Sequence, residues 1–125
     1  EIAAVSEGIT NLDIGIRTDV ISNVPKDIGM QMLVRSMGIN VIATDEIGGK
    51  EDIEAIRYAA CSGVSLIFTM HGKSVEDVFK KDGIKDLLNE KLFNKVILLS
   101  NKYGPGTIED IFDIGNEIKN HKWFN

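Results

Sequence analysis

The apolar positions of the chain follow two different periods, which predicts strands and helices in turn. Three apolar stretches, at residues 39–45, 64–70 and 95–100, are short, rich in Val, Ile and Leu, and cut off by Gly or polar residues. Stretches of this kind are typical of buried strands. Between them, apolar residues recur three or four positions apart, as on one face of a helix. The order strand, helix, strand, helix, strand predicts an α/β fold with right-handed crossovers and a mostly parallel sheet.

Boundary signals predict the helices more closely. A Pro or a Ser-x-x-Asp capping box marks two of their starts, acidic residues crowd one first turn, and glycines mark two of their ends. The expected helices cover residues 26–37 and 51–61, a segment that begins at Ser74, and a short segment over 84–92.

The two ends of the chain are less regular. Residues 1–5 are interpreted as the end of a strand, and the glycines, serines and asparagines over 6–23 predict an extended loop. The Gly-Pro-Gly sequence at 104–106 predicts a turn. Residues 107–114 fit either a returning strand or a helix, and we favour a hairpin followed by a short terminal helix.

The composition excludes several classes of protein. The chain of 125 residues is one domain or part of one, and it contains no apolar run of about 18 residues that would insert directly into a membrane. A net charge of −5 argues against a broad nucleic-acid surface. Because Cys61 is the one cysteine, no intrachain disulfide forms and a reducing compartment is expected. Starting at Glu1 without Met or a signal peptide, the chain is expected to be part of a longer protein.

Two adjacent carboxylates, Asp45 and Glu46, end the first buried strand. An unpaired carboxylate is costly to bury, so the pair belongs at the end of the strand, and in open α/β sheets this end faces the ligand crevice. An apolar strand ending in Asp-Glu has the pattern of a Walker B strand, in which the first acid holds the Mg²⁺ of a nucleotide and the second activates a water. The alternative is a solvated strand end without a ligand.

Three further polar residues are candidates for the same site. His71 ends the next strand, and because neighbouring parallel strands bring their carboxyl ends together, it would lie near Glu46. Arg35, near the end of the preceding helix, and Arg17, on the loop before it, would stabilise the negative charge of phosphoryl transfer. The alternatives remain open: a strand-end histidine bonded to backbone, and arginines in surface ion pairs.

The chain lacks a phosphate-binding loop. No G-x-x-x-x-G-K-[ST] sequence occurs in it, so nothing cradles the β- and γ-phosphates of a nucleotide. The Gly-Gly-Lys sequence at 48–50 is no substitute, because it follows the acidic strand and is too short a loop. One Cys and two His are also too few for a structural zinc site.

Five motifs occur in an order that resembles a known family. They are Gly15-Ile-Arg-Thr-Asp-Val20, Met32-Leu-Val-Arg-Ser-Met37, Val41-Ile-Ala-Thr-Asp-Glu-Ile-Gly48, Gly63-Val64 with Phe68-Thr-Met-His-Gly72, and Val96-Ile-Leu-Leu-Ser100 with Gly104-Pro-Gly-Thr107. Over nearly the whole chain they resemble the stage III sporulation protein AA family of spore-forming bacteria. That family is a group of P-loop ATPases related to the traffic ATPases of type II and type IV secretion.

The resemblance implies a fold and a set of roles. The fold would be a RecA-like P-loop NTPase three-layer sandwich, of which residues 1–125 form the C-terminal portion, without the phosphate-loop strand. Asp45 would act on Mg²⁺ through water, and Glu46 would be the general base. His71 would match the histidine box of the secretion ATPases, and Arg35 their arginine before the Walker B strand. Arg17 would reach a nucleotide, in the next subunit for instance. Where this chain has Asp45, the secretion ATPases usually carry Gly.

The resemblance also implies cofactors and partners. ATP and Mg²⁺ would serve a homo-hexameric ring at the cytoplasmic face of a membrane machine, bound to the membrane proteins of a channel between mother cell and forespore. The function would be ATP hydrolysis that drives assembly or transport through that channel. The alternative is a non-catalytic, ATPase-like scaffold module. A DNA-translocating motor is disfavoured because the chain is acidic and has no basic stripe.

Overall fold

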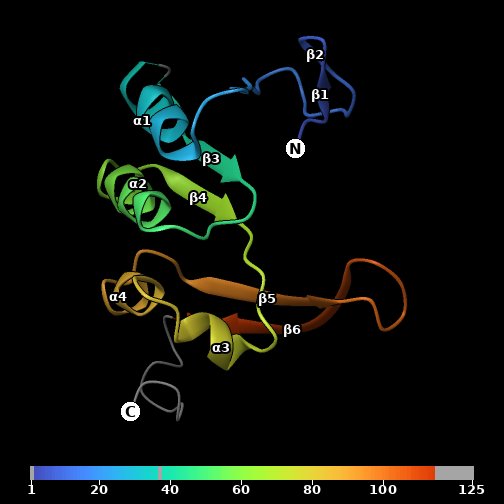
Figure 1. Ribbon diagram of the computed structural model, residues 1–125, viewed down its shortest axis with the longest axis vertical. Helices are drawn as coiled ribbons and strands as arrows, with labels where there is room; N and C mark the ends of the chain where they lie inside the picture. Colours follow the sequence, from blue (N-terminus) through green and yellow to red (C-terminus); the bar gives the residue numbers. More distant parts are fainter. Residues whose placement is uncertain (1, 37, 115–125) are drawn as a thin grey trace. The chain divides into compact units, whose positions relative to one another are not determined.

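The computed structural model describes residues 2–36 and 38–114 and shows a mixed α/β protein (Figure 1). Two compact units make up the chain, one ending at Met70 and the other beginning at His71. The elements of the first unit are β1 (Val5–Ser6), β2 (Ile9–Thr10), α1 (Lys26–Ser36), β3 (Val41–Thr44), α2 (Lys50–Cys61) and β4 (Ser65–Phe68). Those of the second unit are α3 (Val75–Phe79), α4 (Ile84–Asn89), β5 (Lys95–Ser100) and β6 (Thr107–Asp113).

A parallel crossover forms the centre of the first unit. β3 and β4 pair in parallel from Val41 opposite Ser65 to Thr44 opposite Phe68, and α2 connects them. α1 and α2 pack side by side against the same face of this pair (Figure 1). The predicted strand–helix–strand unit with parallel strands is therefore confirmed.

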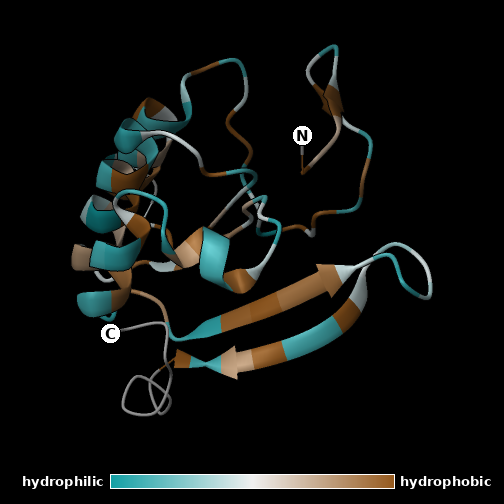
Figure 2. Ribbon diagram, turned by 60° about the horizontal axis from the view of Figure 1, so that its bottom comes forward, coloured by the Kyte–Doolittle hydropathy of each residue, from teal (hydrophilic) through white to brown (hydrophobic). Residues whose placement is uncertain are grey.

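Burial in the first unit is one-sided. The core consists of apolar residues on α1, on α2, on the strand face toward them and in the loop after β3, and its most buried members include Met30, Ile42, Ile47, Ile53, Ala55, Ile56 and Ala59. The other face of the strand pair is apolar but open, with Val41 52% and Ile67 64% exposed. Figure 2 shows the hydrophobic colour along much of β5 as well, where Ile97 is 52% and Leu99 57% exposed.

Local chemistry sets the ends of the two long helices. Pro25 accepts the first bond of α1, from the Gly29 N–H at 2.9 Å. The predicted stop residue of α2, Gly63, lies just beyond the helix end and has φ +83°. The Gly63 N–H donates to the Ala60 carbonyl and the Val64 N–H to the Ala59 carbonyl, the bond pair of a Schellman motif. Such a φ disfavours residues with a Cβ, so glycine suits this turn.

As far as Ile114, the second unit contains two short helices and a hairpin. Ser74 caps α3 as predicted, its hydroxyl accepting from the Asp77 N–H at 3.2 Å. β5 and β6 pair antiparallel from Lys95 opposite Asp113 to Ser100 opposite Thr107, with a register shift after Leu98. The hairpin is thus confirmed, and residues 107–113 form a strand.

The larger parallel sheet predicted from the sequence is absent from residues 2–36 and 38–114. β5 pairs with β6 and not with β4, so each sheet there has two strands and no RecA-like sandwich is present. Only a short turn separates β5 from β6, and such a turn can join antiparallel strands directly. A parallel partner would require a long crossover connection. The predicted loop over residues 6–23 contains β2 instead of being wholly irregular. The expected terminal helix falls outside the described residues. Over the described range no helix is both long and apolar enough to span a bilayer.

Truncation of the buried Ile56 side chain should destabilise the protein far more than the same truncation on the open strand face. Ile56 is fully buried, so Ile56→Ala leaves a cavity and is expected to cost about 2–5 kcal/mol. Ile67→Ala is the matched control, because Ile67 is 64% exposed, and it should cost no more than about 1 kcal/mol. Urea denaturation of both variants measures the difference. Equal losses would show that the open face is covered in solution.

Candidate functional site

The acid pair lies where the first parallel strand leaves the sheet. β3 ends at Thr44, so Asp45 and Glu46 follow directly. The Asp45 side chain is 30% exposed, and Glu46 is exposed. The next residue, Ile47, is 1% exposed and anchors the loop in the core. Two carboxylates therefore reach solvent from a loop whose base is immobilised by burial.

The neighbouring strand continues to hold this loop beyond the end of the sheet. The Glu46 N–H donates to the Thr69 hydroxyl at 2.9 Å, and the Ile47 N–H donates to the Thr69 carbonyl at 2.9 Å. Thr69 directly follows β4, so the two strands stay in register at their carboxyl ends. The backbone under Glu46 is thereby fixed from the side of β4.

The second helix holds the far end of the loop. The Gly48 and Gly49 N–H groups donate to the Asp52 carboxylate at 3.2 and 3.4 Å. Asp52 lies in the first turn of α2, where a negative charge also interacts favourably with the helix dipole. One side chain thus caps the helix and closes the loop that carries the acids.

A lysine on the first helix contacts the acid pair directly. The Lys26 ammonium group donates to the Asp45 carbonyl at 2.8 Å and to the Glu46 carbonyl at 2.7 Å. It also forms an ion pair with Asp45 Oδ1 at 3.3 Å. Sequence reasoning missed Lys26. Its signal was a lysine as the first residue of a helix, where the helix dipole disfavours a cation.

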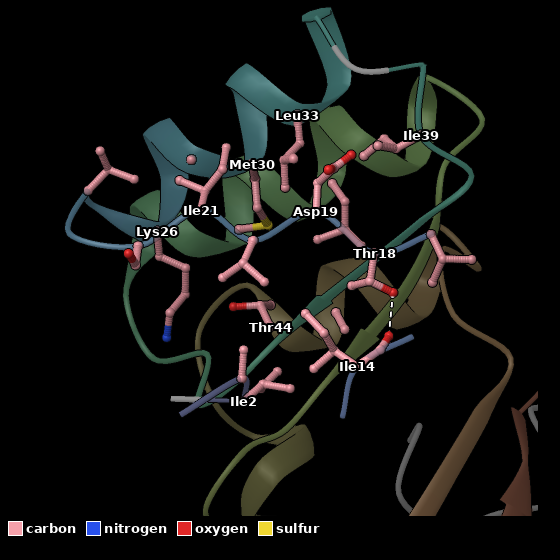
Figure 3. Close-up of a pocket in the computed structure, with 18 of the residues that line it drawn as sticks. Ile2, Ile14, Thr18, Asp19, Ile21, Lys26, Met30, Leu33, Ile39 and Thr44 are labelled. Atoms are coloured by element: carbon pink, nitrogen blue, oxygen red, sulfur yellow. Dashed lines mark hydrogen bonds between the residues drawn. The ribbon is translucent and has the colours of Figure 1, made fainter. Parts of the chain in front are cut away.

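Arg17 and Asp45 line the same cavity in the first unit. This cavity has a volume of about 940 Å³ and follows β3 along residues 38–45. Lys26 lines it from α1, together with the apolar side chains of Met30 and Leu33 (Figure 3). Arg17 and Asp45 thus share the lining of one cavity beside β3, and a direct approach of the two side chains stays a prediction.

Arg35 lies apart from the acid pair. Its guanidinium group is 5.8 Å from the ring centre of Tyr58 on α2, and its Nε donates to the Tyr58 hydroxyl at 3.4 Å. Arg35 follows Lys26 by nine residues in α1, which is roughly 13 Å along the helix axis. Because Lys26 contacts the acids, Arg35 lies at the opposite end of the helix from them.

His71 is the first residue of the second unit and is exposed. Its carbonyl accepts a hydrogen bond from the Lys81 ammonium group. The next residue, Gly72, leaves no room for a Cβ, because the Val78 side chain and the Ser74 carbonyl lie against it. The segment that carries His71 is therefore packed closely onto α3. The proximity of His71 to Glu46 stays a prediction.

The acidic loop offers carboxylates to a metal ion, and binding of magnesium there stays a prediction. Among residues 2–36 and 38–114, no group of three or more His, Cys, Asp or Glu side chains is arranged to hold a metal ion. Mg²⁺ in nucleotide sites is usually held by one or two carboxylates together with waters and substrate phosphates. Asp45 is the carboxylate that such a site would use, and in the structure it pairs with Lys26 at 3.3 Å.

Fold and site together describe an α/β protein with an acidic loop at the carboxyl ends of parallel strands. The chain belongs to the family described as sporulation stage III, protein AA, whose family model matches residues 1–118. It is similar to stage III sporulation protein AA of Bacillus subtilis (strain 168), with 41% identity over 113 residues. The matched region is 90% of this chain and 37% of the relative, so the chain spans little more than a third of that protein. No solved structure shows significant similarity to the chain.

Removing the Thr69 hydroxyl should loosen the backbone under Glu46. Thr69→Val keeps the shape but deletes the acceptor of the Glu46 N–H. A lost hydrogen bond of about 1 kcal/mol corresponds to about fivefold faster amide exchange at Glu46. Residue-resolved hydrogen exchange measures this effect, with Thr69→Ser as the matched control that keeps the oxygen. Unchanged protection in Thr69→Val would show that the bond does not hold the loop.

Proposed function

We propose that the chain is the C-terminal part of the ATPase domain of a sporulation motor. The motor hydrolyses ATP to drive assembly or transport through a channel between mother cell and forespore. The observation that carries this proposal is the acid pair Asp45–Glu46, held at the carboxyl end of a parallel strand by contacts from two helices and the neighbouring strand. Family membership supports the link to sporulation.

The two acids take different roles because their surroundings differ. Asp45 is half-buried beside a cation and would hold Mg²⁺ through water. Glu46 is exposed on a fixed backbone and would accept a proton from the water that attacks the terminal phosphate. Bound Mg²⁺ would neutralise the charge on the phosphate oxygens. The chain itself supplies the position and the base.

The basic candidates are not equally placed. Arg17 lines the same cavity as Asp45 and is the better candidate for a phosphate contact. Arg35 is engaged with Tyr58 at the far end of α1, which supports helix packing. His71 follows Thr69 by two residues, and Thr69 bonds the Glu46 N–H, so we keep His71 as the candidate that orients the water.

We further propose that the complete domain is a RecA-like sandwich whose phosphate loop lies upstream of this chain. β3 and β4 pair only with each other among the described strands, and Val41 and Ile67 on their open face are exposed. Both features favour further strands and a further layer. The assembly would be a homo-hexamer at the cytoplasmic face of the mother-cell membrane, bound to membrane proteins of the channel.

A second candidate function is a non-catalytic scaffold module that organises the same membrane complex. Asp45 stands where the secretion ATPases usually carry Gly, and Lys26 already pairs with it. Such a pair also suits a purely structural loop. A degenerate phosphate loop in the full-length protein would favour this alternative, and an intact one favours the motor.

Replacing the proposed base should stop turnover without stopping nucleotide binding. Glu46→Gln in the full-length protein is expected to lower kcat by about 10²- to 10⁴-fold, because general-base catalysis is lost. Phosphate release gives kcat, and fluorescent-ATP titration gives affinity, which should be retained. Glu51→Gln is the control, since Glu51 is an exposed acid in the first turn of α2. Turnover unchanged by Glu46→Gln would move the base elsewhere.

The 125-residue chain alone is expected neither to bind ATP tightly nor to hydrolyse it. It contains no G-x-x-x-x-G-K-[ST] sequence, so the β- and γ-phosphates find no cradle of backbone N–H groups. Calorimetric titration with Mg-ATP and a phosphate-release assay test this expectation. Mg-dependent turnover by the chain alone would contradict it.

A further inference from the structure

We infer that Lys26 is a positioning residue of the acidic loop. Its ammonium group fixes the two consecutive carbonyls of Asp45 and Glu46, and so sets the directions in which their carboxylates leave the backbone. This inference rests on the proposed function, because it assigns Lys26 to the same hydrolytic site. Lys26 does not itself touch the reacting atoms.

The Lys26 ammonium group lies closer to the two backbone carbonyls than to the Asp45 carboxylate. An ammonium group has three N–H donors, and three acceptors surround that of Lys26. The two carbonyl oxygens lie at 2.8 and 2.7 Å, whereas Asp45 Oδ1 is farther away at 3.3 Å. The Lys26 side chain is 29% exposed, so its contacts are partly shielded from water. Lys26 therefore grips the peptide unit more closely than the carboxylate.

The other end of this anchor is also rigid. Pro25 fixes the backbone just before Lys26, and its carbonyl accepts the first bond of α1. One turn further on, Met30 is 2% exposed and holds α1 in the core. A flexible side chain thus connects two places that burial has already immobilised. Neither end of the connection yields easily.

The position of Lys26 conflicts with the local preference of a helix. A cation in the first turn is disfavoured by the dipole, and Asp27, the next residue, has the favoured sign. A residue that breaks a local rule is best explained by a gain elsewhere. Here the gain is the pair of carbonyl contacts across 19 and 20 residues of chain.

These contacts complete the restraint of the loop. The Glu46 N–H donates to Thr69, and the carbonyls of Asp45 and Glu46 both accept from Lys26. Rotation of the peptide that joins Asp45 to Glu46 would break at least one of these bonds. Without Lys26, the carbonyls would turn to water and the acids would lose their alignment. Small displacements of catalytic groups are costly to rate.

The test compares two substitutions of Lys26 in the full-length protein. Lys26→Met keeps the apolar stem and deletes the donors, whereas Lys26→Arg keeps donors and charge. We expect Lys26→Met to lower kcat by about 10- to 100-fold while KM for ATP changes less than about threefold, and Lys26→Arg to restore part of the loss. Lys85→Met, at an exposed lysine of α4, is the control and should retain wild-type turnover.

Residue-resolved hydrogen exchange on the same variants separates this inference from the proposed function. In Lys26→Met the Glu46 and Ile47 amides should lose protection, while the amides of β5 keep theirs. Should the wild-type protein hydrolyse no ATP, the proposed function fails, and the exchange result still decides whether Lys26 fixes the loop.

Three results would overturn the positioning role. One is that the Glu46 and Ile47 amides of Lys26→Met exchange hydrogen at the same rates as in the wild-type protein. Another is a uniform loss of protection across the chain, which would assign Lys26 to general stability. The third is an unchanged kcat with a lower Mg²⁺ requirement, which would show that Lys26 acts only by neutralising Asp45.

Discussion

The loop after β3 depends on hydrogen bonds from three separate elements, and the rest of the first unit is arranged so that these bonds can form. Lys26 reaches the loop from α1, Thr69 from the end of β4, and Asp52 from α2. The parallel pairing of β3 with β4 sets the distance to Thr69, and the packing of α1 beside α2 sets the distance to Lys26. Burial of Ile47, the residue after Glu46, anchors the loop in the core between these contacts. Two of these anchors, Lys26 and Thr69, are therefore tertiary contacts, whereas the Asp52 contact is local in sequence.

Sequence patterns predicted the elements well where the signal is local. The strand over 95–100, the capping Ser74 and the turn at Gly63 need only neighbouring residues, and each is present. Period and length also predicted the parallel pair. The contact between Lys26 and the loop was not predictable, because it joins residues about 20 positions apart. No local rule specifies which lysine reaches which carbonyl.

The placement of Arg35 shows the same limit of sequence-based prediction. Arg17 and Arg35 were both candidates because a guanidinium group stabilises phosphate charge. This chemical argument does not consider at which end of a helix the arginine lies. The direction comes from the crossover, since a helix that precedes a parallel strand runs back along it. Lys26 at the start of α1 therefore meets the carboxyl end of β3, and Arg35 near the end of α1 meets Tyr58 instead. Helix polarity separates these residues by roughly 13 Å.

The open strand face bears on how the acidic loop would work. Val41 and Ile67 are large apolar side chains that remain more than half exposed, and an exposed apolar surface of this kind is typical of a face that another layer covers. The acids are already restrained before any such layer forms, because their three anchors lie within the first unit. In the proposed motor, a phosphate-holding segment would therefore meet carboxylates that need no rearrangement. Binding energy could then serve catalysis instead of being spent on ordering the site.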